Sequence, residues 1–333
     1  MLRCFYQDTI SRYKGTKKNR YYIIFYQKTF IFTIFVVPLY TFLIFLLQIM
    51  QVITTQRDLT MQMEACLRQN KTIGLVPTMG ALHEGHATLV RRAVMENDVC
   101  VVSIFVNPTQ FNNPEDLLKY PRTLNKDVQL LTELGTHFVF APTPEEMYTP
   151  EEIKQPFSFD FNGLDEVMEG KMRPGHFNGV VQIVSRLFDL VRPTRAYFGE
   201  KDFQQLAIIH HMVDRSSLSE RYAGLKIVDC PIVRENSGLA MSSRNERLSE
   251  QEKQTAITIS KTLFASLQWA KTASVKEVQQ RVIDTINAVD GLEVEYYEIV
   301  DKDTLQPTNC WNNAVGCVTV YCGPVRLIDN IRY

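Results

Sequence analysis

The sequence lacks the cysteine pattern that a disulfide framework or a zinc site needs. Its seven cysteines are scattered over 333 residues, their number is odd, and no two form a C-x-x-C pair. This argues against a disulfide-stabilised secreted fold and against a zinc knuckle, and it favours a reducing compartment, the cytoplasm. An excess of charge is also lacking, since 36 Lys and Arg against 37 Asp and Glu give a formal net charge of -1. No overall positive field draws the chain to nucleic acid, so any anion that it binds needs a local site.

Internal repeats and low-complexity tracts are absent as well, whereas apolar residues are plentiful. Hydrophobic residues make up 45% of the chain, which excludes wholesale disorder. At roughly 100–200 residues per domain, the length predicts two domains.

The first 49 residues differ from the rest. They carry seven basic side chains and one acid, and residues 30–50 form a run of 21 without a charge. Such a run can span a bilayer as one helix, with the basic residues on the cytoplasmic side. The composition, rich in Phe, Ile, Tyr and Lys, is equally typical of translated AT-rich non-coding DNA, and Met50 begins a sequence that suits a first strand. We expect either a membrane anchor at 30–50 or, as the favoured interpretation, a misassigned start that makes residues 1–49 an extension without a role.

Residues 50–235 alternate short apolar runs with stretches of helical spacing. This alternation predicts a parallel sheet with helices on both faces, the doubly wound or Rossmann-like α/β class. The predicted strands are 72–76, 99–106, 137–141, 195–198 and 226–231, and the predicted helices are 87–95, 124–134, 179–190 and 203–213.

Residues 236–333 predict a smaller α+β domain. Helical patterns at 251–271 and 275–289 precede strand-like runs at 292–300, 314–321 and 325–329. The link at 234–247 is polar and contains glycine, as a hinge or an active-site loop does.

The strongest motif is Pro77-Thr-Met-Gly-Ala-Leu-His-Glu-Gly-His86, between the predicted strand 72–76 and the helix that follows it. Gly80 and Gly85 let the backbone approach a phosphate closely, and the helix N-terminus offers free N–H groups and the positive end of its dipole. His83 and His86 can direct ring N–H groups at the same phosphoryl oxygens, which stabilises charge on a phosphate in transfer. Two structural or metal-binding histidines are the alternative, although H-x-x-H lacks the zincin spacing and no nearby carboxylate is an obvious third ligand.

A second motif, Met241-Ser-Ser-Arg244, lies on the predicted link. Two hydroxyls and a guanidinium can hold phosphates as the loop closes, although a solvated serine-rich loop explains the same letters. The His-x-Gly-His pattern followed by such a loop resembles the nucleotidyltransferase superfamily. Three further segments, 102–111, Tyr120-Pro-Arg-Thr123 and 198–206, make residues 50–333 similar to one family within it, the pantothenate synthetases or pantoate–β-alanine ligases. Residues 1–49 have no counterpart in that family.

The resemblance implies an ATP-dependent ligase that joins (R)-pantoate to β-alanine through a pantoyl adenylate and releases pyrophosphate and AMP. It also implies Mg²⁺ with the ATP, no tightly bound organic cofactor, no nucleic acid, and a homodimer. The carboxylate of pantoate is already an anion, so its attack on the α-phosphorus needs orientation and charge neutralisation rather than a general base.

The resemblance further implies roles for individual residues. His86 is the expected proton donor, His83 assists at the phosphates, and Lys201 is a point charge for them. The expected ATP-binding residues are Met79, Gly80, Ala81, Leu82, His83, Glu84, Gly85, His86, Gly199, Glu200, Lys201, Asp202, Val233, Met241, Ser242, Ser243 and Arg244. Gln110 and Gln205 are expected to bind pantoate with Asn107 in support, and Asp202 is the candidate ligand for Mg²⁺ or the ribose. Without the resemblance, both glutamines are ordinary surface residues and 199–202 is an exposed charged turn.

Several interpretations stay open. Arg173 lies in a stretch rich in glycine and cations, and it is a candidate contact for a phosphate or for the carboxylate of β-alanine. The histidines at 137, 176, 210 and 211 are expected to be structural or solvent-facing. Two other functions compete: a different adenylyl- or cytidylyltransferase of the same fold, and a membrane-anchored, non-catalytic nucleotide-binding protein. A tRNA synthetase is disfavoured, because the chain after Ser242 leaves little room for an anticodon-binding domain.

Overall fold

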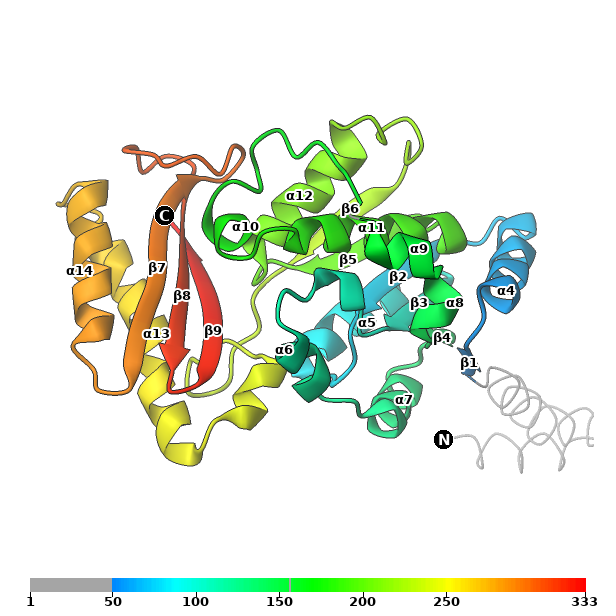
Figure 1. Cartoon of the computed structure of the whole chain (residues 1–333), viewed down its shortest axis with the longest axis horizontal. Coiled ribbons are helices and arrows are strands. Elements are labelled where there is room, and N and C mark those ends of the chain that lie inside the picture. Colours follow the sequence, from blue (N-terminus) through cyan, green and yellow to red (C-terminus); the bar gives the residue numbers. More distant parts are fainter. Residues whose placement is uncertain (1–49, 156) are drawn as a thin grey trace, which may run out of the picture. The chain divides into compact units, whose positions relative to one another are not determined.

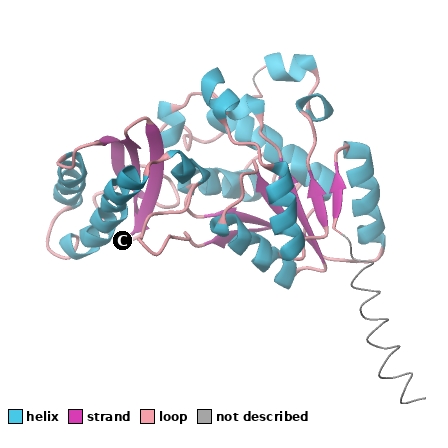
Figure 2. Ribbon diagram, turned by 90° about the horizontal axis from the view of Figure 1, so that it is seen from below, coloured by secondary structure: helices cyan, strands magenta, loops and turns pink. Residues whose placement is uncertain are grey.

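The computed structural model describes residues 50–155 and 157–333 (Figures 1 and 2). The predicted membrane-spanning or misassigned segment lies outside the described residues, except for Met50. In the described part of the chain, no helix combines the length and the apolar character needed to cross a membrane.

Six parallel strands form the larger sheet, in the order β1-β4-β3-β2-β5-β6. They are β1 Gln51–Ile53, β2 Ile73–Thr78, β3 Val99–Ile104, β4 Phe138–Phe140, β5 Arg195–Gly199 and β6 Lys226–Cys230. The short β-branched runs of the sequence become strands that are buried on both faces, as parallel sheets require. The predicted α/β class is confirmed, and the strand boundaries differ from the prediction by a few residues.

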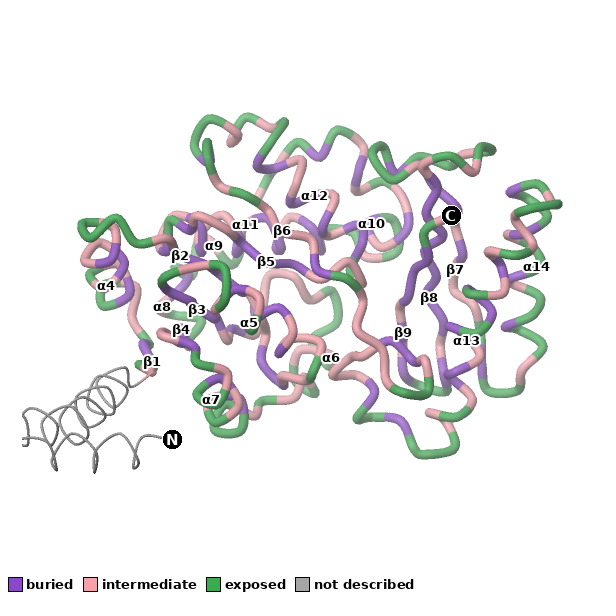
Figure 3. The backbone as a smooth tube through the Cα atoms, turned by 180° about the vertical axis from the view of Figure 1, so that it is seen from behind, coloured by how far each residue is buried: buried purple, intermediate pink, exposed green. Residues whose placement is uncertain are grey.

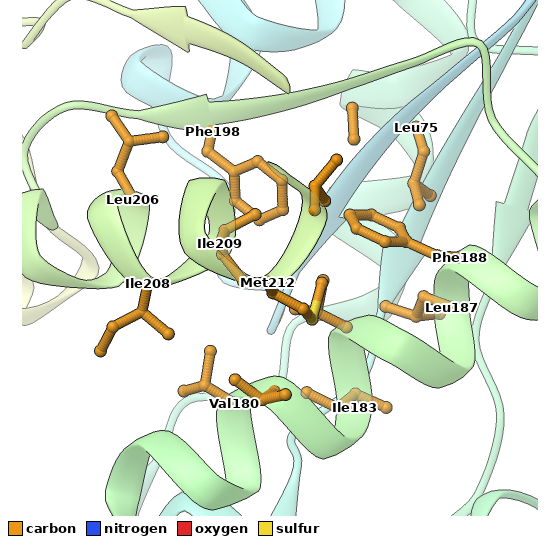
Figure 4. Close-up of a cluster of buried hydrophobic side chains, with 14 of the residues drawn as sticks. Leu75, Val180, Ile183, Leu187, Phe188, Phe198, Leu206, Ile208, Ile209 and Met212 are labelled. Carbon is orange, nitrogen blue, oxygen red and sulfur yellow. The ribbon is translucent and has the colours of Figure 1, made fainter. Parts of the chain in front are cut away.

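Helices cover both faces of this sheet and create one core on each. Their bounds are α4 Gln56–Arg68, α5 Glu84–Glu96, α6 Pro114–Lys119, α7 Leu124–Glu133, α8 Pro144–Met147, α9 Pro150–Lys154, α10 Met168–Met172, α11 His176–Val191 and α12 Phe203–Asp214. Leu75 of β2 faces the core built by α11 and α12, where it lies near Phe188 and Met212 (Figure 4). Its neighbour Val76 faces the opposite core, with Val90 of α5.

The C-terminal part is α+β, as predicted. It contains α13 Glu250–Trp269, α14 Val275–Asn287 and the antiparallel strands β7 Leu292–Asp301, β8 Ala314–Cys322 and β9 Val325–Arg332. The two helices pack on one face of this sheet around a third core. Backbone contacts join Met50–Tyr333 into one unit, so a domain boundary at residue 235 stays a prediction. The tube in Figure 3 shows β5 and β8 as buried strands within this unit.

The topology explains where a ligand site forms. From β2 the chain crosses first to β3 on one side, and later to β5 on the other side. The strands β2 and β5 pair only at Gly74 and Leu75, so they diverge before their carboxyl ends. In doubly wound sheets this switch point opens a crevice outside the carboxyl ends of the strands.

Candidate active site

A cleft lies at this switch point, between the loops that follow β2, β3, β5 and β6. Its cavity volume is about 230 Å³, slightly below the roughly 300–1,000 Å³ of typical small-molecule sites. The predicted site residues that line it are Met79, His83, Gly85, His86, Asn107, Gln110, Gly199, Lys201, Asp202, Gln205, Val233, Met241, Ser242, Ser243 and Arg244. Segments that are far apart in the sequence therefore meet in one cavity.

The two histidines begin α5, which starts at Glu84 rather than at the predicted residue 87. His83 is its N-cap, and the His83 Nδ1 accepts a hydrogen bond from the backbone N–H of Gly85 at 3.1 Å. The His86 Nδ1 accepts from the backbone N–H of His83 at 3.4 Å. A neutral imidazole whose Nδ1 accepts a hydrogen bond carries its proton on Nε2. Both Nε2–H groups are therefore donors that the capping bonds leave available.

The surroundings keep both histidines neutral in the protein alone. Burial and, to a smaller extent, the positive charge of Lys201 lower the pKa of His83 to about 4. Burial lowers the pKa of His86 to about 3, with added repulsion from His83 and Lys201. The ring centroids are 4.1 Å apart, so a second positive charge there is costly. The negative charge of an incoming polyphosphate would raise both pKa values.

A carboxylate that the sequence analysis missed shapes the loop before His83. Asp127, in the first turn of α7, accepts hydrogen bonds from the backbone N–H groups of Ala81 at 3.0 Å and Leu82 at 2.8 Å. Gly80 sits here with φ +82°, and a Cβ on it would lie 3.1 Å from the Asp127 Oδ2. The N–H groups of Ala81 and Leu82 therefore face Asp127. Gly80, Ala81 and Leu82 were expected to contact ATP, and none of the three lines the cleft.

Two other predicted ATP contacts also lie outside the cleft lining. The carboxylate of Glu84 is exposed and pairs with Arg91, seven residues further along the exposed face of α5. The carboxylate of Glu200 pairs with Arg332 of β9 at 2.9 Å. Ion pairs hold both side chains away from the cleft, and no local sequence motif indicates these ion pairs.

The turn that carries Lys201 and Asp202 is held by the C-terminal sheet. The buried Asn330 of β9 donates from Nδ2 to the carbonyls of Glu200 at 2.8 Å and Lys201 at 3.0 Å. Its neighbour Asp329 forms a buried two-point ion pair with Arg234, at 2.6 and 2.9 Å. The sequence could not pair residue 330 with residue 200, because nothing local to either position marks the contact.

The predicted Met-Ser-Ser-Arg loop folds back onto the segment after β6. The Met241 N–H donates to the Val233 carbonyl at 3.0 Å, which brings two predicted ATP contacts side by side. The Ser242 Oγ accepts from the N–H of Arg244 at 3.2 Å and starts a short 3-10 turn, η3 Ser243–Arg247.

An acidic side chain from across the cleft reaches this loop. Asp116 of α6 lies 3.7 Å from the Arg244 guanidinium and 3.6 Å from that of Arg247. Tyr120, just after α6, lines the cleft as well. Its motif, Tyr120-Pro-Arg-Thr123, contributed to the family resemblance, but no role was predicted for this residue. The carboxylate of Asp116 thus partly neutralises the positive charge of Arg244, the cation expected at the phosphates.

The amides expected to bind pantoate come from two elements. Gln110 ends the 3-10 turn η2 Pro108–Gln110, and its Oε1 accepts from the Asn107 Nδ2 at 3.1 Å. Gln205 lies in the first turn of α12 and lines the cleft, whereas its neighbour Gln204 is buried on the carbonyls of Leu164 and Val167. Asn107 lines the cleft, but both of its amide protons and both lone pairs of its Oδ1 are already used by Gln110, Gly179, Thr109 and Tyr148, so it supports the site rather than contacting a ligand.

Arg173 lines a second cavity that adjoins the cleft at Lys201, Asp202, Gln205 and Arg244. Its guanidinium lies 3.5 Å from the carboxylate of Glu169. Arg326 of β9 binds the same carboxylate at two points, at 2.7 and 2.8 Å. Burial raises the pKa of Glu169, but the hydrogen bonds from Arg326 outweigh it and hold the value at about 2.

The remaining histidines make protein contacts, as expected of structural residues. His176 is buried at the start of α11, and its Nδ1 donates to the Gln110 carbonyl at 2.8 Å. The His137 Nδ1 accepts from the Cys100 N–H, while His210 and His211 bind Asp229 and the Asp160 carbonyl. His176 thus stands closer to the site than the sequence analysis expected.

The side chains that line the cleft indicate what kind of metal ion it could hold. Among the described residues, no group of three or more His, Cys, Asp and Glu side chains could hold a metal ion. Asp202 is the only carboxylate among the described residues that line the cleft. A single carboxylate ligand, Asp202, is sufficient for a Mg²⁺ ion that is held mainly by substrate phosphates. It is too few for a metal ion that the protein would hold by its own side chains.

Known proteins match the chain over the same region. The sequence model of the pantoate-beta-alanine ligase family matches residues 51–332. A pantothenate synthetase from Phocaeicola vulgatus is 58% identical over 287 residues, which are 85% of this chain and 99% of that protein. The one from Christiangramia forsetii is 46% identical with the same coverage.

Solved structures agree. The crystal structure of pantothenate synthetase from Thermus thermophilus matches with a TM-score of 0.77 and 41% identity, over 85% of this chain and 99% of that one. A pantoate-beta-alanine ligase from Francisella tularensis, complexed with beta-gamma ATP and beta-alanine, matches with a TM-score of 0.70 and 33% identity, over 85% and 98%. The chain therefore belongs to the pantoate–β-alanine ligase family.

Proposed function

We propose that the cleft joins (R)-pantoate to β-alanine at the expense of ATP, through an enzyme-held pantoyl adenylate. One observation carries the assignment of roles: two neutral histidine Nε2–H donors, the cations Lys201 and Arg244 and the amides Gln110 and Gln205 all line one cleft. The related F. tularensis ligase, whose complex contains beta-gamma ATP and beta-alanine, supports this choice of substrates.

In the first step, a carboxylate oxygen of pantoate attacks the α-phosphorus of ATP and pyrophosphate leaves with the bonding electrons. Negative charge grows on the phosphoryl oxygens, where preorganised donors act most strongly. His86 and His83 donate from Nε2 to these oxygens, with His86 as the proton donor. Lys201 and Arg244 neutralise the β- and γ-phosphates, and Ser242 and Ser243 donate to them.

In the second step, the neutral amine of β-alanine attacks the acyl carbon of the adenylate. The carbon–nitrogen bond forms as the bond between the acyl carbon and the phosphate oxygen breaks, AMP leaves with the bonding electrons, and the proton lost from the amine passes to solvent. Gln110 and Gln205 hold pantoate in place during both steps, since Gln110 offers amide N–H donors, and Gln205 a donor and an acceptor, to hydroxyl and carboxylate groups. The enzyme thereby confines the reactive adenylate until the amine arrives.

The adenosine and the metal occupy the rest of the cleft. Val233 and Met241 lie against adenine, Met79, Gly85 and Gly199 give the nucleotide close backbone approach, and Asp202 binds the ribose or the Mg²⁺ that accompanies the phosphates. When bound, Mg²⁺ neutralises phosphate charge. Arg173 is assigned to the carboxylate of β-alanine, because it lines the cavity that adjoins the cleft beside Gln205.

Pyrophosphate release tests this function. We expect the full chain and a chain that starts at Met50 both to release one equivalent per site with ATP, Mg²⁺ and pantoate, and to turn over continuously once β-alanine is added. Release that depends on another acid, with none from pantoate, would mean a different nucleotidyltransferase. A folded protein that releases none with any acid and sediments with membranes would favour the anchored, non-catalytic alternative.

Assembly and location are part of the proposal. Family resemblance supports a homodimer formed through the larger α/β part, which light scattering after gel filtration tests. The six cysteines of the described residues are all unpaired, which suits the cytoplasm. Membrane association is expected only if residues 1–49 are present in the native protein, and intact mass together with fractionation decides this.

A further inference from the structure

The orientation of the Gln110 amide follows from its neighbours. Amide oxygen and nitrogen positions have to be deduced from the hydrogen bonds around them. The Asn107 Nδ2 lies 3.0 Å from the Gly179 carbonyl, which can only accept, so this atom of Asn107 must be the donor. It donates its second proton to Gln110 at 3.1 Å, so that atom of Gln110 must be the oxygen. The Gln110 NH₂ group is then the end left for the cleft, where it also lies 3.1 Å from the Met79 Sδ.

Two hydroxyl groups hold the other end of the Asn107 amide. Its Oδ1 accepts from the Tyr148 hydroxyl at 2.9 Å and from the Thr109 hydroxyl at 3.1 Å. The Gly179 carbonyl sets the orientation of this amide, because a turned-over amide would place its oxygen against that carbonyl, and two buried acceptors in contact are costly. The two hydroxyls, which rotate to donate, then hold the amide in this orientation and position through its Oδ1.

Burial and ring packing restrain the Tyr148 side chain. It follows α8, is 3% exposed, and its ring packs against Phe105, with the Arg186 guanidinium 5.0 Å from its centroid. Arg186 itself pairs with Glu152 of α9. Burial raises the pKa of Tyr148 to about 12, so the hydroxyl keeps its proton in any ordinary assay. The mechanism above uses no atom of this residue, and Tyr148 does not line the cleft.

We propose that Tyr148 is a positioning residue for pantoate: its hydroxyl holds the Asn107 amide, whose Nδ2 holds the Gln110 Oε1 and leaves the Gln110 NH₂ group facing the substrate. Gln110 then presents hydrogen-bond donors to the pantoate oxygens, and the site selects a substrate with acceptors at this position. The inference rests on the proposed contact between Gln110 and pantoate, and it extends that contact to a residue outside the cleft.

The test compares Tyr148→Phe with Tyr222→Phe, in the full chain. Both changes remove one hydroxyl from a buried ring, and the Tyr222 hydroxyl contacts the Ser185 carbonyl, at 3.3 Å, and Asp189, which do not line the cleft. We expect Tyr148→Phe to raise the KM for pantoate about 3–10-fold, the range set by one hydrogen bond, because Thr109 still holds Asn107 in part. The KM for ATP should stay within about twofold, and Tyr222→Phe should change neither constant.

A double-mutant cycle separates positioning from general damage. If Tyr148 acts through Gln110, then Tyr148→Phe has no further effect on pantoate in a Gln110→Ala background. Additive effects, equal changes in the ATP and pantoate constants, or an unchanged pantoate KM would each overturn the proposal. Gln110→Ala without any effect on pantoate would overturn the proposed contact itself, and this inference with it. Thr109→Val, which removes the other hydroxyl, provides a second measurement if Tyr148→Phe folds poorly, and it should shift the pantoate KM in the same direction.

Discussion

Replacing Asp127 by alanine should damage both the stability and the catalysis of this enzyme, although Asp127 does not line the cleft. Its carboxylate accepts the N–H groups of Ala81 and Leu82 and the hydroxyl of Thr123, at 2.8–3.2 Å, and Asp127 is 3% exposed. Alanine would leave two N–H groups without their acceptor in the segment that leads to His83.

The expected magnitude follows from the two backbone hydrogen bonds. A hydrogen bond to a charged group contributes about 1.5–3 kcal/mol, so losing both costs about 3–6 kcal/mol if nothing replaces them. Because Leu82 is half-buried, water can replace part of the lost hydrogen bonding once the carboxylate is removed, and we expect the lower part of this range, about 3 kcal/mol, in the free energy of unfolding. Displacement of His83 by the relaxed loop should also slow adenylation, by about 10-fold or more.

Urea unfolding and the pantoate-dependent burst of pyrophosphate measure these two effects. Asp290→Ala, at an exposed position after α14, is the matched control and should change neither. Asp127→Asn keeps one acceptor oxygen and should fall between alanine and the native residue. Native stability together with a native burst rate in Asp127→Ala would refute the reasoning, because the two amides would then have found equivalent partners.

Three other changes test separate parts of the site. His86→Ala should lower the adenylation rate about 10²–10⁴-fold in rapid-quench experiments while calorimetry shows little change in ATP affinity, because the lost donor acts on charge that develops in the transition state; a native rate would exclude its role. Asp116→Asn should lower the KM for ATP about 2–5-fold, because Arg244 no longer shares its charge with Asp116; an unchanged KM would mean that this ion pair does not compete with phosphates. The hydrogen bond that His210 donates to Asp229 raises the pKa of His210 above its ordinary 6.5, so the stability that His210 contributes is fully present below pH 6.5 and is lost as the pH rises through the raised value. The difference in unfolding free energy between the native chain and His210→Gln should shrink over that window, and a constant difference would contradict the assignment.

The histidine half of the site could be predicted because its information is local. The order strand, glycine turn and helix lies within residues 73–96, and the N-cap of α5 is made by His83 itself. The predicted helix nevertheless starts at residue 87, three residues too late. The side chains of His83 and His86 form capping bonds to the backbone, and these bonds start α5 at Glu84. The helix α4 was also missed, although Leu59, Met63 and Cys66 have the spacing of one buried helical face.

The rest of the site could not be predicted, because it depends on contacts between distant segments. Asp127 resembles any other acid in the first turn of an amphipathic helix, and only the fold brings it to Ala81 and Leu82, 46 and 45 residues earlier. Glu200 lies outside the cleft lining for the same reason, since its ion-pair partner Arg332 is 132 residues away. Glu84 also lies outside the lining, but its partner Arg91 is on the same helix. Short helices such as α6, which carries Asp116, have too few residues to show a periodic pattern.

The strand β9 explains why the phosphate side of the cleft depends on the C-terminal sheet. Asn330 holds the carbonyls of the turn that carries Lys201, Asp329 holds Arg234 at the start of the loop that carries Arg244, and Arg326 holds Glu169 beside Arg173. Each cation assigned to an anionic group of the substrates is thus supported by a different residue of one strand. Because β8 and the hydrophobic core behind it keep β9 in place, these three supports keep a common spacing, and the cations keep theirs. The C-terminal sheet therefore contributes no predicted ligand contact of its own and yet sets the geometry in which the triphosphate is bound.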